Sequence, residues 1–131
     1  MSGIDQTFAD ATLDAMFGGT AVSFTAPIHC RLMTANGSDT AAGTELATGS
    51  GYTAGTGAPT FTFAAASAGS KASSSAVTVT NMPAATIVGV AVWDSNATPK
   101  RVMWGALTAS KTTNAGDTFS IASGSLTAAL A

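Results

Sequence analysis

Short runs in which apolar and polar residues alternate dominate the second half of the chain. They lie at residues 60–64, 76–80, 86–93, 102–107, 117–122 and 126–130, and Gly, Ser, Asn and Pro residues separate them. Alternation with a period of two is typical of half-buried β-strands, and several such strands without intervening helices indicate an antiparallel arrangement. The run from Ile28 to Met33 alternates in the same way. We therefore predict a mainly β fold, either an antiparallel β-sandwich or a barrel-like domain, which is β-rich over residues 60–131.

The beginning of the chain has a different period, which predicts one short N-terminal helix over about residues 7–17. Apolar residues recur there at the spacing of a helical turn: Phe8, Leu13, Met16 and Phe17. Thr7 followed three residues later by Asp10 forms a capping pattern, and Gly18 with Gly19 provides the stop signal.

Residues 36–59 show no apolar period and contain many glycines, so we predict a long loop. A short strand around residues 45–47 or 52–53 is the alternative within it. A loop of this length in a compact domain is usually functional or is ordered by a partner. The whole chain, residues 1–131, is expected to form a single domain, because its length suits one core.

The composition indicates a weakly charged surface that favours contact between copies. Ala, Gly, Ser and Thr make up 77 of the 131 residues, charged residues only 9%, and the formal net charge is −2. Few surface charges and a small net charge promote association, so we expect self-association as a dimer or trimer.

The same counts argue against two classes of partner. The five basic residues form no stripe that could neutralise a nucleic-acid backbone. No run approaches the roughly 20 apolar residues that a membrane-spanning helix needs. We therefore expect neither nucleic acid nor membrane as a partner.

The residues that could support chemistry are few and badly spaced, so we expect no enzyme. His29 is the sole histidine and Cys30 the sole cysteine, and neighbouring residues of a strand point to opposite faces, which separates a nucleophile from its base. One His, one Cys and scattered acidic residues give no converging metal ligands. The sequence thus predicts no catalytic, metal or cofactor-binding residues and no cofactor.

The stretch VWDSNATPKRVMWG, residues 92–105, is a predicted hairpin with both tryptophans. If Trp93 faces Arg101, then Val92 faces Val102 and Val90 faces Trp104. That register buries Trp104 with the valines and leaves Trp93, Arg101 and Met103 on the other face, where a guanidinium can stack on the indole ring.

Two interpretations of this hairpin stay open. It is a structural hairpin with a soluble turn, or Trp93 and Arg101 anchor a subunit contact, since Trp and Arg are enriched at interface hot spots. The candidate interface residues are Trp93, Arg101, Met103 and, in the long loop, Tyr52.

The C-terminal segment resembles small virion structural proteins of tailed bacteriophages. In them a strand ending in Trp-Asp precedes the pattern G-A-L-x-x-S-K-x-x-x-x-G-D-x-x-x-x-x-x-G-x-L-T, and the N-terminal LDAMFGG looks alike too. The matching positions here are Trp93, Asp94, Gly105, Ala106, Leu107, Ser110, Lys111, Gly116, Asp117, Gly124, Leu126 and Thr127.

The resemblance implies a structural role in a virion that assembles in the host cytoplasm. We expect a head-decoration protein on the outer surface of the capsid, bound to the major capsid protein. The alternative is a minor tail or tail-fibre component that contacts other tail proteins and has an adhesin-like binding role.

Overall fold

The computed structural model describes residues 2–129, and these are mainly β-structure. They include the helix α1 (Gln6–Gly18) and a short 3-10 turn, η1 (Gly55–Gly57). The strands in chain order are β1 (Ser2–Ile4), β2 (Ile28–Ala35), β3 (Thr44–Glu45), β4 (Thr60–Phe61), β5 (Ser70–Ala72), β6 (Val77–Val79), β7 (Ala85–Trp93), β8 (Arg101–Thr113), β9 (Phe119–Ile121) and β10 (Thr127–Ala129).

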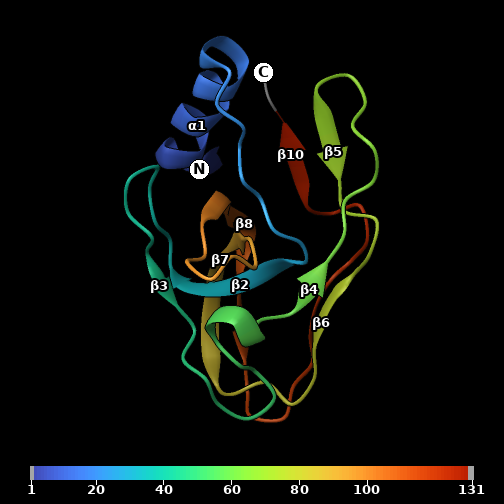
Figure 1. Cartoon of the computed structure of the whole chain (residues 1–131). Helices are drawn as coiled ribbons and strands as arrows, with labels where there is room; N and C mark the ends of the chain where they lie inside the picture. Colours follow the sequence, from blue (N-terminus) through green and yellow to red (C-terminus); the bar gives the residue numbers. More distant parts are fainter. Residues whose placement is uncertain (1, 130–131) are drawn as a thin grey trace.

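All strand pairs among these residues are antiparallel, as the alternating sequence pattern predicted. The main sheet has six strands in the order β1-β8-β7-β2-β3, with β4 pairing to β2 as well. Strands β6 and β9 form a second, two-stranded sheet, and β5 and β10 form a third. The described sheets do not close into a barrel. Figure 1 shows β5 and β10 at the same end of the molecule as α1.

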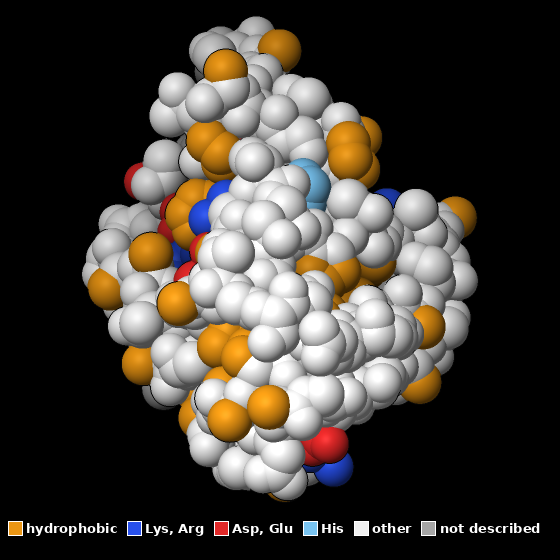
Figure 2. Space-filling view, turned by 90° about the horizontal axis from the view of Figure 1, so that it is seen from below, with side chains coloured by type: hydrophobic (Ala, Val, Ile, Leu, Met, Phe, Trp, Pro, Cys, Tyr) orange, Lys and Arg blue, Asp and Glu red, His pale blue; other side chains and the backbone are white. Residues whose placement is uncertain are grey.

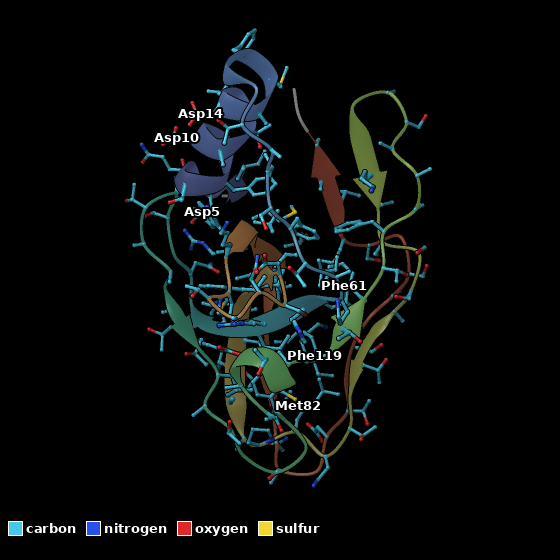
Figure 3. All side chains as sticks on the ribbon, in the orientation of Figure 1. Asp5, Asp10, Asp14, Phe61, Met82 and Phe119 are labelled. Atoms are coloured by element: carbon cyan, nitrogen blue, oxygen red, sulfur yellow. The ribbon has the colours of Figure 1, made fainter. Side chains whose placement is uncertain are left out.

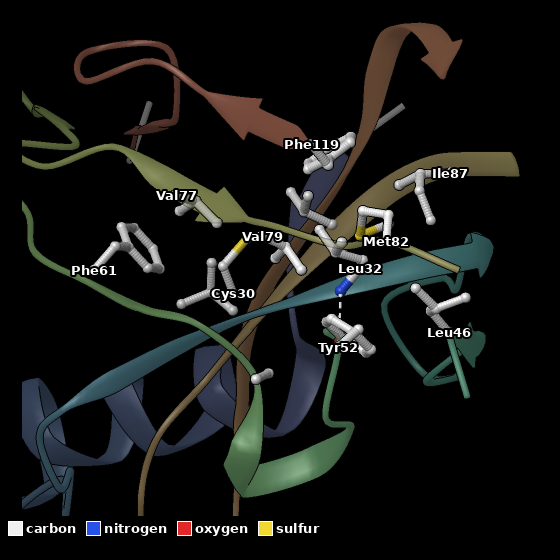
Figure 4. Packing of buried hydrophobic residues seen from close by; sticks show 13 residues of the cluster. Cys30, Leu32, Leu46, Tyr52, Phe61, Val77, Val79, Met82, Ile87 and Phe119 are labelled. Atoms are coloured by element: carbon white, nitrogen blue, oxygen red, sulfur yellow. Dashed lines mark hydrogen bonds between the residues drawn. The ribbon is translucent and has the colours of Figure 1, made fainter. Parts of the chain in front are cut away.

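The core lies between the main sheet and the β6–β9 pair, as Figure 4 shows. Cys30 and Leu32 from β2 pack there with Val77 from β6 and Phe119 from β9, and all four are at most 5% exposed. The two-stranded sheet can cover this face because its apolar side chains alternate with Thr78 and Ser120, which point outward and lie within hydrogen-bonding distance of each other.

Helix α1 extends one residue beyond each predicted end, and its N-cap differs from the prediction. The side chain of Asp5, not Thr7, accepts the capping hydrogen bond, from the backbone N–H of Thr7 at 3.0 Å. Gly19 ends the helix in the left-handed conformation with φ 71°, as the Gly-Gly signal predicted. Asp5 takes the N-cap position because β1 ends at Ile4 and α1 begins at Gln6, which leaves Asp5 as the residue directly before the helix.

Several strand boundaries differ from the alternation pattern. Strand β4 ends at Phe61 instead of continuing to residue 64, and β8 runs six residues beyond the predicted end at Leu107. Strands β1 and β5 were not predicted, because each is only three residues long and has too few apolar residues to show alternation. Leu130, the end of the last predicted strand, lies outside the described residues.

The surface is almost uncharged, in agreement with the composition. The face in Figure 2 shows mostly neutral side chains, with charged ones confined to small groups and apolar ones spread between them. None of the helices in residues 2–129 has the length and apolar character needed to cross a membrane.

Candidate binding surface

The β7–β8 hairpin pairs Trp93 with Arg101, as predicted, but the register beyond that pair is shifted by one residue. Val92 faces Met103 and Ala91 faces Trp104, so Val102 is an extra residue in β8. An extra residue in one strand is a β-bulge, and beyond it every side chain of that strand changes face relative to the regular register.

The bulge overturns the predicted separation of the two tryptophans. Trp104 is buried with Met33 and Ala91, and Trp93 packs against the same cluster. Val90 and Val92 belong instead to the main core on the other face of the sheet. Because alternation was counted without the bulge, the prediction that Trp104 packs with the valines was wrong.

The cation that stacks on Trp93 is Arg31, not Arg101. The guanidinium carbon of Arg31 lies 4.1 Å from the centroid of the Trp93 ring, and Arg31 also pairs with Glu45 at 3.5 Å. The sheet register explains the contact, because β2 lies on the opposite side of β7 from β8 and brings His29 and Arg31 beside Trp93 and Ala91. The indole Nε1 of Trp93 and the Nε of Arg31 are both buried and have no hydrogen-bond partner among the described residues.

Arg101 is buried and occupied by contacts within the chain. Its Nε and Nη2 donate to the same carboxylate oxygen of Asp5, at 2.9 and 2.7 Å, and its Nη1 donates to the carbonyl of Ala41. A further hydrogen bond reaches the carbonyl of Ser38. Arg101 therefore joins the start of α1 and the 38–41 turn to the main sheet.

The turn of the hairpin is organised by Asp94, which is fully buried. Its carboxylate accepts hydrogen bonds from the backbone N–H of Lys100 at 2.7 Å and from the side-chain amide of Asn96 at 3.0 Å. Desolvation raises the pKa of Asp94, but these hydrogen bonds outweigh it and hold the pKa below its usual value. The acidic residue in the turn is thus a structural group.

The long loop over residues 36–59 is ordered by its own contacts. The hydroxyl of Tyr52 donates to Glu45 Oε1 at 2.7 Å and accepts from the backbone N–H of Leu32, the bond drawn in Figure 4. Glu45 also accepts from the backbone N–H of Gly55 at 2.9 Å. Tyr52 is 1% exposed, so its side chain offers almost no surface to a partner.

His29 and Cys30 are both buried in β2 and are used structurally. His29 contacts the carbonyl of Ala58 through Nδ1 at 2.9 Å and the hydroxyl of Ser95 through Nε2 at 2.8 Å. Burial raises the pKa of the Cys30 thiol to about 12, so at neutral pH it is a protonated thiol and not a nucleophile. No three His, Cys, Asp or Glu residues gather as metal ligands within residues 2–129.

A cavity of about 380 Å³ opens beside Trp93 and the start of α1. Trp93 and Lys100 line it together with hydroxyl-bearing residues of three segments: Thr7, Ser23 and Thr40. Met103, the remaining predicted interface residue, is half-buried and lines a different, larger cavity.

The structure therefore brings Trp93 and Arg101 to one region, and it places Met103 and Tyr52 elsewhere. Sequence reasoning did not find that Arg31 stacks on Trp93. It also missed Asp5 as the partner of Arg101 and Asp39 as the partner of Trp104. The carboxylate of Asp39 accepts from the Trp104 indole at 3.0 Å. One signal in the sequence could have pointed to these contacts. A buried Arg or indole N–H needs a hydrogen-bond acceptor, and the chain has few acidic residues that can supply one.

Comparison with known families gives the biological context of this fold. The family described as podophage GP4 fiber I protein gp80 matches residues 3–129. The chain belongs to this family. No curated protein matches the chain. The match extends from β1 to β10 and therefore includes nearly all the described residues.

Membership makes this chain a structural component of a phage virion, as the C-terminal pattern indicated. A family of fibre proteins implies a non-enzymatic role. It also supports the fibre alternative better than a head-decoration protein, which was our first expectation.

Proposed function

We propose that this fibre-family protein is part of a podophage tail fibre, where it associates with other tail proteins and has an adhesin-like role at the host surface. The match of the fibre family to residues 3–129 carries the proposal. The titratable groups of β2 and of the hairpin support a structural role. His29 and Asp94 make hydrogen bonds within the fold, and burial keeps the Cys30 thiol protonated at neutral pH.

The cavity beside Trp93 is the contact site that we favour for host recognition. Its volume of about 380 Å³ is within the range of small-molecule sites. It combines the apolar surface of an indole ring with the Lys100 ammonium and the hydroxyls of Thr7 and Thr40. Such a mixture suits one or two sugar units of a surface glycan, which have apolar ring faces and hydroxyl rims.

The location in the virion is tested by quantitative mass spectrometry of purified particles and by electron microscopy with a label on this chain. We expect few copies per particle, with the label at the tail. Many copies distributed over the head would instead establish a decoration protein and overturn the proposal.

The adhesin-like role is tested with a host-polysaccharide array and the variant Thr40→Phe. Thr40 is exposed, so a bulky side chain there fills the cavity mouth without disturbing the core. We expect binding by the native chain, loss of binding in Thr40→Phe, and no change in the distant surface variant Lys111→Ala. If no glycan binds, or if Thr40→Phe binds like the native chain, this cavity is not the recognition site.

A further inference from the structure

A large apolar cavity opens between α1, the main sheet and the β5–β10 pair. It measures about 770 Å³, and its walls come from α1, from four strands of the main sheet (β2, β4, β7 and β8) and from both strands of the β5–β10 pair. It shares one lining residue, Phe8, with the cavity beside Trp93. This space is therefore a second candidate site, separate from the one that we favour for host recognition.

The walls of this cavity suit a hydrocarbon chain better than a peptide or a sugar. Thr62 and Lys71 are the two polar residues of the lining, and the others are aromatic or aliphatic. A peptide or a sugar that enters such a space gives up hydrogen bonds to water, and these side chains return few of them. A hydrocarbon chain has no such loss, and it gains free energy when its surface is removed from water.

Lys71 supplies the one charged group of the lining, and it lies on the face of the β5–β10 pair that covers the cavity. Lys71 pairs with Ala128 across the two strands, and directly opposed residues project from the same face. Both residues line the cavity. Lys71 is exposed, and within residues 2–129 it takes part in no ion pair. Its ammonium group is therefore available to an anionic group at the edge of the cavity.

The acidic residues of α1 do not compete for this lysine. Asp10 and Asp14 lie on the side of α1 that faces away from β10, as Figure 3 shows. The lining itself contains no Asp or Glu residue. A ligand carboxylate beside Lys71 would thus meet a positive charge and no carboxylate of the lining.

We propose that this cavity binds a free fatty acid, with the hydrocarbon tail against Phe24, Ile28 and Met103 and the carboxylate on Lys71. The volume is within the range of small-molecule sites. An anionic membrane surface attracts clusters of basic residues, whereas this site has one lysine in a chain of net charge −2, so a single molecule is the better occupant. The site goes beyond the proposed function and does not depend on it.

Isothermal titration calorimetry of the full chain with octanoate, decanoate, laurate and myristate, each kept below its micelle concentration, tests the tail. We expect the affinity to rise about fourfold for each added methylene group until the tail fills the cavity, because each buried methylene adds a constant gain. This series needs no substitution, so it does not depend on whether a variant folds.

Decanol, which has the same chain length as decanoate but no charge, tests the head group. The native chain should prefer decanoate by about two- to fivefold, the contribution of one exposed ion pair. Lys71→Met should remove this preference. The matched control is Lys111→Met, an exposed lysine toward the far end of β8, which should keep it.

A bulky side chain inside the cavity tests the location. Ala128→Phe should weaken decanoate binding by at least about tenfold, because the ring takes the space that the tail needs. Ala109→Phe places the same ring at an exposed position of β8 outside the lining and should have no effect. Thr40→Phe, which blocks the cavity beside Trp93, should also leave decanoate binding unchanged.

Four results would overturn the proposal: no binding of any of the acids, an affinity that does not rise with chain length, a preference for decanoate that persists in Lys71→Met, and native-like binding by Ala128→Phe. Co-sedimentation with phosphatidylglycerol vesicles without binding of the soluble acids would also overturn it and would assign the surface to a membrane. None of these results bears on glycan binding or on the label in the particle images, so the proposed function is tested separately.

Discussion

Arg101 has the largest number of structural contacts among the charged side chains of the hairpin. It is 5% exposed and joins three segments far apart in the sequence: Asp5, the carbonyls of Ser38 and Ala41, and its own strand. A buried guanidinium is stable only when its donors are paired, and this arrangement pairs all three of its nitrogens. Arg101 therefore joins three segments of the fold through these contacts.

Replacement of Arg101 by Met should lower the free energy of unfolding by about 3 kcal/mol, because it leaves Asp5 and two carbonyls without their partner. Asp5→Asn should cost less, about 1 to 2 kcal/mol, since the amide oxygen still caps α1. Urea unfolding followed by tryptophan fluorescence measures both. The double variant should lose less than the sum, and a loss in Arg101→Met no larger than that of the exposed control Lys111→Met would contradict this assignment.

The buried Cys30 thiol and Tyr52 hydroxyl make the folded state less stable at alkaline pH. The pKa of Cys30 rises from 9.0 to about 12 through burial, and burial likewise raises the pKa of the Tyr52 hydroxyl above its ordinary value. Between pH 9.0 and about 12 the unfolded thiol loses its proton while the folded thiol keeps it, so the folded state binds more protons. Stability is therefore fully present below pH 9.0 and falls above it.

We expect the free energy of unfolding to fall by about 1.4 kcal/mol per pH unit from Cys30 alone once the pH exceeds the unfolded pKa. Tyr52 adds to the loss at higher pH. Urea midpoints measured at neutral and alkaline pH check the slope, and Cys30→Ala is the control, because it removes the thiol titration even though its cavity lowers the overall stability. An equal slope in Cys30→Ala would show that Cys30 titrates normally in the folded chain.

At the scale of the elements, the sequence predicted the mainly β class, the antiparallel pairing and the single N-terminal helix with its glycine stop. It could not predict the bulge at Val102, because alternation on both sides of an inserted residue is locally unchanged. The order within residues 36–59 was also hidden, since it comes from Glu45 and Tyr52 acting through hydrogen bonds and not from an apolar period.

Strands β7 and β8 and Asn36, the first residue of the long loop, can lie in close contact because Gly89 has no side chain. A Cβ there would meet the Asn36 side-chain oxygen and come within 2.6 Å of the Gly105 carbonyl. We expect Gly89→Ala to lower the free energy of unfolding by more than about 2 kcal/mol, because backbone atoms must move.

The matched control for this substitution is Gly18→Ala at the end of α1. A Cβ at Gly18 meets nothing within 4 Å, and alanine favours the helix, so this variant should be neutral or more stable by up to about 1 kcal/mol. Chemical unfolding of both variants gives the comparison, and equal stabilities would show that β7 and the loop are not packed as closely as described.

At the scale of the whole molecule, one core connects the two halves of the chain. Tyr52 and Leu32 come from the first half, and Val79, Met82 and Phe119 from the second, and all belong to one buried cluster. The long loop thus supplies residues to this core. Both tryptophans lie on the other face of the main sheet, so their fluorescence reports on packing against that face.

We therefore expect residues 1–131 to unfold in one cooperative transition. Tryptophan fluorescence, which reports on Trp93 and Trp104, and far-ultraviolet circular dichroism, which reports on all strands, should give coincident urea curves. The fragments 1–59 and 60–131 should each remain unfolded, because β2 and the β6–β9 pair bury their apolar faces against each other. Separate transitions, or a fragment 60–131 with the strand signal of the full chain, would show that the β-rich half folds independently of the helix, β2 and the loop.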